Sequence, residues 1–137
     1  MRQIEYIFID SDTKNNHRKS SHHAIPNIRY HYVVNSQGLV LNPTDTSIPA
    51  HIIQGPNYDR NIYNRYSIFI RYCGSLKPET CNLKLRAKLI RLLVEQRERF
   101  PNAKILGVSE LDITSSHTPV RVNPKMNELR KELSNIY

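Results

Sequence analysis

The sequence predicts an α/β fold, in which a central mixed β-sheet is flanked by helices within a single domain spanning residues 1–137. Three observations predict this class. The length suits one compact domain with a core. Short runs of β-branched and aromatic residues are bounded by polar or glycine-containing turns, as strands are. Two later segments repeat apolar residues at helical spacing, and strands interleaved with helices favour a mixed sheet.

Three apolar runs predict the middle of the sheet. Residues 4–9 are β-branched and aromatic and give way to a long polar stretch, so they indicate an opening strand. Residues 67–73 are almost continuously apolar and stop at Gly74, which favours a central strand. Residues 103–108 indicate a short buried strand that follows Pro101.

A hairpin and a long connection are expected between the first two of these runs. Residues 27–34 lead into the turn sequence 35–38, with Gly38 at positive φ, and residues 39–41 return. Residues 42–66 are rich in Pro, Asn, Asp and Gly and have no sustained period. We expect a long functional loop there.

Two amphipathic patterns predict the helices. The first has one apolar face made of Leu85, Leu89, Leu92, Leu93 and Phe100, and Pro101 ends it. The second begins with Asn123 as N-cap and Pro124 as first helical residue. Its apolar face consists of Met126, Leu129, Leu133 and Ile136.

The charge and the termini limit the classes of function. Lysine and arginine number 20 against 12 aspartate and glutamate, so the net charge is +8 and the surface attracts anions. Nucleic acid, an anionic membrane and an acidic wall polymer all fit that charge. No apolar run approaches the roughly 20 residues of a membrane span, and the start does not resemble a signal peptide. We therefore expect synthesis in the cytoplasm, where Cys73 and Cys81 stay reduced.

Two polar residues stand at positions that favour a site. Asp10 ends the first predicted strand, where open α/β sheets place their ligands, although a solvated aspartate is the plain alternative. His31 lies in the hairpin, and alternation along a strand turns it away from Tyr30 and Tyr32.

The order of these segments is similar to that of a known family. Residues 28–40, which contain Tyr30-His31-Tyr32, resemble the Gly-Tyr-His-Phe hairpin of the zinc-dependent N-acetylmuramoyl-L-alanine amidases, which include amidase-type phage lysozymes and peptidoglycan recognition proteins. Residues 49–51 resemble that family's Gly-Ala-His, and residues 66–70 its Asn-Ser-Ile-Gly-Ile strand. Residues 89–107 are similar to its long helix and the strand before a zinc-binding histidine. The resemblance covers nearly the whole chain and implies the amidase fold.

The resemblance implies a zinc site whose ligands are altered here. The family uses three ligands, usually two histidines and a cysteine, and zinc-bound water attacks the amide between the muramyl lactyl group and L-alanine. Asp10 takes the first position, and Val108, which has no lone pair, takes the second. The third falls on Asn123 or on His117, and we favour His117. Glu110 or Asp112 is near enough in sequence to replace the lost ligand.

The same resemblance implies the substrate residues. Tyr30 matches the tyrosine that lies beside the zinc, with packing against the long helix as the alternative. Arg121 is able to donate hydrogen bonds to a developing oxyanion. The remaining substrate-binding candidates are His31, His51, Asn57 and Tyr58.

Three functions follow from these observations. The first is an amidase-like domain that has lost its zinc site and binds peptidoglycan, as muropeptide fragments, or a protein partner, reaching the wall after release or export. The second is a working zinc amidase with the altered ligands Asp10 and His117. The third, which we favour least, is a nucleic-acid binder that uses the basic segments 84–99 and 58–72.

Overall fold

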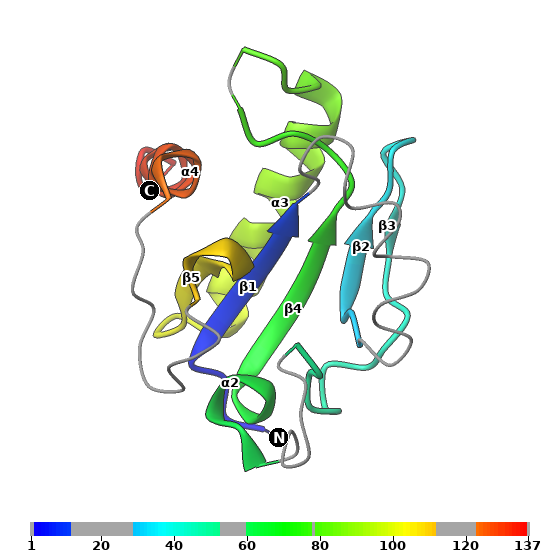
Figure 1. Ribbon diagram of the computed structural model, residues 1–137, viewed down its shortest axis with the longest axis vertical. Helices are drawn as coiled ribbons and strands as arrows, with labels where there is room; N and C mark the ends of the chain where they lie inside the picture. Colours follow the sequence, from blue (N-terminus) through cyan, green and yellow to red (C-terminus); the bar gives the residue numbers. More distant parts are fainter. Residues whose placement is uncertain (1, 12–28, 53–59, 78, 112–122, 137) are drawn as a thin grey trace.

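Five strands form one mixed sheet in the computed structural model, which describes residues 2–11, 29–52, 60–77, 79–111 and 123–136. The strand order is β3-β2-β4-β1-β5. The four strands β2, β4, β1 and β5 run parallel, and β3 is antiparallel to β2 (Figure 1). Together with three helices, this sheet confirms the predicted α/β class with a mixed sheet.

The strands lie where the apolar runs predict them. Their bounds are β1 Tyr6–Ser11, β2 Tyr32–Val34, β3 Val40–Leu41, β4 Ser67–Tyr72 and β5 Lys104–Gly107. The strand β4 lies between β2 and β1, which confirms its central position. In the hairpin turn, the Asn35 side chain accepts hydrogen bonds from the backbone N–H groups of Gln37 and Leu39, and Gly38 has φ 85°.

The two long helices cover one face of the sheet. The helices α3, Leu83–Arg99, and α4, Pro124–Ser134, are N-capped by the side chains of Asn82 and Asn123, as the sequence predicts for Asn123. Both helices contribute leucines to the larger core, together with the buried residues of β1 and β4. Where α4 passes β5, a Cβ atom at Gly107 would lie only 2.8 Å from Met126 Cγ, so this crossing requires glycine.

A second apolar cluster lies on the opposite face. It contains Phe8, Ala50, Ile52, Tyr63 and Phe69. Tyr63 comes from the short helix α2, Ile62–Arg65, which is N-capped by Asn61 and lies near the amino ends of the strands (Figure 1). The sequence analysis predicts only a loop there, because four residues are too few to show a helical period.

The predicted strand 103–108 ends earlier than expected. Its last residue begins a single 3-10 turn, η2, which spans Val108–Glu110. Among the described residues, no helix is both long and apolar enough to cross a bilayer. Cys73 and Cys81 are partly buried and are not joined by a disulfide bond.

Candidate functional site

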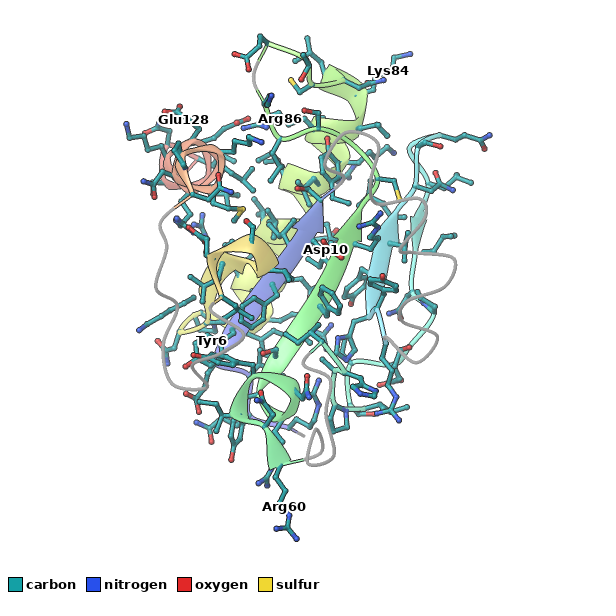
Figure 2. All side chains as sticks on the ribbon, viewed as in Figure 1. Tyr6, Asp10, Arg60, Lys84, Arg86 and Glu128 are labelled. Atoms are coloured by element: carbon teal, nitrogen blue, oxygen red, sulfur yellow. The ribbon has the colours of Figure 1, made fainter. Side chains whose placement is uncertain are left out.

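Four side chains form a row across the face opposite α3, at the carboxyl ends of the parallel strands. Arg71 of β4 is in register with Asp10 of β1 and with Val33 of β2. The pairing of Ile9 with Gly107 brings Val108 level with Asp10 on the other side. Alternation puts Asp10 and Arg71 on the same side as Phe8 and Phe69 of the second cluster. The carboxyl row is therefore Val33–Arg71–Asp10–Val108, and Figure 2 shows Asp10 at the arrowhead ends of the central strands.

Asp10 forms an ion pair within this row. Its Oδ2 lies 3.3 Å from Nη1 of Arg71, and the two side chains are 30% and 13% exposed, respectively. Because Arg71 is mostly buried in a central strand, its guanidinium needs an anion nearby, and Asp10 supplies it. The strand-end aspartate is therefore part of a partly buried pair and is not simply solvated.

Val108 stands beside Asp10 without a donor atom. It is partly buried and packs against the second cluster from the first position of η2. Asp10 and Val108, the first and second ligand positions that the resemblance implies, are thus neighbours. Val108, however, offers only an apolar side chain.

Glu110, proposed from the sequence as a replacement ligand, is fully engaged elsewhere. It is 2% exposed, and its two oxygens accept 2.8 Å hydrogen bonds from the two Nη atoms of Arg130. Oε1 also accepts from the Gly107 backbone N–H and Oε2 from that of Asn123, both at 2.9 Å. Burial raises the pKa of this carboxyl, but the bonds from Arg130, Gly107 and Asn123 outweigh burial and lower it. Glu110 thus joins β5 to α4, and its geometry does not fit a metal ligand.

One of the two candidates for the third ligand is described by the structure. The side chain of Asn123 accepts from the Lys125 backbone N–H as the cap of α4, and its Nδ2 donates to Ser109 Oγ at 3.0 Å. Asn123 thus lies next to the residue that follows Val108. His117 and Asp112 lie outside the described residues.

The described residues do not fit a zinc site. Within the ranges given above, no three His, Cys, Asp or Glu side chains come together. At these positions the row has a carboxylate, Asp10, that is already paired with Arg71, and a valine, Val108, that has no donor atom. The oxygens of Glu110 bind Arg130 of α4. We derive no chemical step through zinc from this donor set.

His31 lies in the interior, which does not fit the expected contact with substrate. Its side chain is fully buried, Nδ1 accepts from the Phe69 N–H at 2.9 Å, and Nε2 lies 2.6 Å from the Ile48 carbonyl oxygen. Because Nδ1 accepts, Nε2 carries the proton and donates to Ile48. Burial lowers the pKa of His31 to about 4. The neutral ring therefore joins β4 to the loop that follows β3.

Tyr30 occupies the site face rather than the helix face. Its ring lies 5.0 Å from that of Phe69 and packs against the second cluster, whereas Tyr32 packs against the core under α3. The predicted alternation is wrong here, because β2 begins only at Tyr32 and the chain bends at His31. The alternative role of Tyr30, packing against the long helix, is also wrong.

The other substrate candidates are placed only in part. His51 is 5% exposed, between two residues of the second cluster, Ala50 and Ile52. Asn57, Tyr58 and Arg121 lie outside the described residues.

Sequence reasoning missed Arg71 and Arg130, the two cations of this region. Arg71 interrupts the apolar run of the central strand, and an unpaired charge in such a strand is a signal that a carboxylate lies on a neighbouring strand. Arg130 gives no comparable signal, because it is one of several charged residues on α4.

Comparison with known proteins adds no assignment. No model of a protein family matches the chain, and a search of curated proteins finds no match.

Proposed function

We propose that this chain is an N-acetylmuramoyl-L-alanine amidase-like domain that lacks the usual zinc site and binds peptidoglycan fragments at the carboxyl row. The observation that carries the proposal is the position of Asp10 beside Val108. The resemblance implies that these two positions, far apart in the sequence, are ligands of one site. The strand order and register that make them neighbours support that implication.

The chemistry around the row suits a sugar–peptide ligand. Tyr30 offers a partly exposed aromatic ring on the same face, and aromatic rings stack on sugar rings. Arg71 and Asp10 offer a hydrogen-bond donor and an acceptor for peptide groups. Because Asp10 is already paired with Arg71 and Val108 offers no donor atom, the row has no set of ligands for a metal-activated water. The proposed activity is therefore recognition without cleavage.

Neither of the other functions is favoured by a specific observation. An active amidase needs a third ligand, and Glu110 is saturated by Arg130 and two backbone N–H groups. A nucleic-acid interface needs a continuous basic face. On α3, however, the exposed acidic residues Glu95 and Glu98 lie among the basic ones, and Arg86 is buried against Glu132.

Cosedimentation with purified sacculi, followed by calorimetric titration with muropeptides, tests the proposal. We expect the wild-type chain to bind both in moderate salt and Asp10→Ala to bind about tenfold more weakly, which corresponds to one hydrogen-bonded charged contact. Lys84→Ala is the control, because Lys84 is exposed on α3, the helix that covers the other face.

Three results would contradict this proposal. They are absence of sacculus and muropeptide binding, equal losses in both variants, and retention on DNA with a steep salt dependence, which indicates the nucleic-acid function instead. Release of the stem peptide with a free amino group on its L-alanine, and a free carboxyl group on the muramyl lactyl group, would show that the wild-type chain cleaves the amide.

A further inference from the structure

The row at the carboxyl ends contains a cation of its own. Arg71 comes from the central strand β4, and its Nη1 lies 3.3 Å from Asp10 Oδ2. Asp10 is the one residue of the row that offers an oxygen to a metal ion, since Val33 and Val108 are apolar. The only acidic side chain of the row is therefore already neutralised by a fixed positive charge.

A guanidinium differs from a histidine in how it competes with a metal. Arginine stays protonated at all physiological pH values, so it neither yields its proton to make room for a cation nor offers a lone pair. A zinc ion on Asp10 would lie about 2.0–2.2 Å from a carboxylate oxygen, and hence only a few ångströms from the guanidinium. Like charges at that separation repel, and the repulsion is stronger at a partly buried site than in bulk water.

Binding a metal would also weaken the contact between Asp10 and Arg71. The Arg71 side chain is only 13% exposed, so water compensates little for a weakened contact with the carboxylate. Both effects act in the same direction: they favour the Asp10–Arg71 pair over an Asp10–metal bond.

We propose that Arg71 takes the place of the metal ion in this site and that its guanidinium excludes divalent cations from the carboxyl row. This inference rests on the proposed function, because the row is read as the position of a former zinc site. The inference goes beyond the altered ligands in one respect. Reintroducing ligand residues does not by itself restore metal binding as long as Arg71 is present.

A matched set of full-length variants tests the inference by zinc calorimetry. Val108→His supplies a ligand atom beside Asp10, and Asn123→Cys supplies a second one next to Ser109, at the other position that the resemblance offers. Arg71→Met is then added to the same background. Methionine is uncharged and fits a mostly buried position. We expect Arg71→Met to tighten zinc binding about 100-fold, the result of removing one nearby positive charge, whereas the control Arg71→Lys keeps the charge and leaves zinc binding weak.

Circular dichroism and thermal unfolding establish that each variant folds. If the cysteine at the α4 cap prevents folding, the same Arg71 comparison is made with Val108→His alone, which leaves the Asn123 cap intact. Equal zinc affinities with and without Arg71→Met overturn the inference, including the case in which neither folded variant binds zinc. So does tight zinc binding by the variant that retains Arg71.

Failure of this inference is distinguishable from failure of the proposed function. Muropeptide binding by the wild-type chain tests the function without metal. Zinc binding by the variants tests the role of Arg71 without muropeptide.

Discussion

Two carboxylate–arginine pairs lie near each other at the carboxyl ends of β1 and β5, and they are built in opposite ways. Glu110 and Arg130 share two hydrogen bonds of 2.8 Å, and the Glu110 side chain is 2% exposed. Nη1 of Arg71 lies 3.3 Å from Oδ2 of Asp10, and the Asp10 side chain is 30% exposed. The two pairs differ in the length of the contact between carboxylate and guanidinium and in the exposed fraction of the carboxylate side chain.

This difference suits a structural role for Glu110 and, in the proposed function, a role in ligand binding for Asp10. Each Glu110 oxygen accepts one hydrogen bond from Arg130 and one from a backbone N–H group. Arg130 also donates to the Ile105 carbonyl oxygen, so these bonds connect β5 to α4. Asp10 is accessible, so a ligand reaches it without displacing a helix. A carboxylate at a strand end is therefore a candidate for function only when its own hydrogen bonds leave it accessible.

The largest effect is expected from breaking the buried pair. Glu110→Gln removes the charge that balances Arg130 and replaces an acceptor with a donor, so we expect the free energy of unfolding to fall by about 3–5 kcal/mol. Urea denaturation measures it. Glu128→Gln is the control, because Glu128 is exposed on α4, the helix that carries Arg130. It should change stability by less than about 0.5 kcal/mol. A loss below about 1 kcal/mol in Glu110→Gln would show that the pair does not hold α4.

Acid should weaken the fold in two separate steps. His31 is buried as the neutral ring with a pKa of about 4, below the ordinary 6.5, so the unfolded chain binds its proton first and stability falls as the pH drops from about 6.5 to 4. The lowered pKa of Glu110 removes stability only below its ordinary 4.5. We expect the His31 contribution to reach about 3 kcal/mol by pH 4.

The pH dependence of unfolding in His31→Asn isolates this contribution. Asparagine keeps an acceptor for the Phe69 N–H but does not titrate, so the variant is less stable at pH 7 and loses less stability than the wild type between pH 6.5 and 4.5. Parallel pH profiles of the two proteins would contradict the assignment of a neutral His31.

The smallest effect is expected at the less buried of the two pairs, Asp10–Arg71. Asp10→Asn keeps the size of the side chain and removes one partly exposed ionic contact, so the free energy of unfolding should fall by only about 1 kcal/mol. The same urea denaturation measures it, and 0.5 M salt should reduce the difference from the wild type. A loss as large as that of Glu110→Gln would mean that the two pairs are alike and that Asp10 is structural.

Local patterns in the sequence were sufficient for most of the fold. Periodic leucines located α3 and α4, Asn123-Pro124 located the start of α4, and an unbroken apolar run located β4 in the centre of the sheet. These features depend on neighbours within about four residues, which a sequence displays directly. The helix α2 was missed because it is a single turn.

The site was predictable only in outline. Asp10 was predicted as a site residue because it stands at the end of a predicted strand. Its pairing with Arg71 depends on the register between β1 and β4, which the sequence does not display. The alternation expected for residues 30–32 is wrong because the chain bends at His31, before β2 begins. Glu110 was proposed as a ligand because it lies close to Val108 in the sequence. The sequence does not show that its carboxylate is bound by Arg130 and by the Asn123 N–H, because these partners are far from it along the chain.

The bond from the Asn123 N–H to Glu110 has a consequence for engineering this protein. It joins Glu110 directly to Asn123, although twelve residues lie between them in the sequence. A reporter peptide inserted into this interval leaves both partners of the bond in the chain, so we expect the bond to hold the start of α4 against η2 in the lengthened protein.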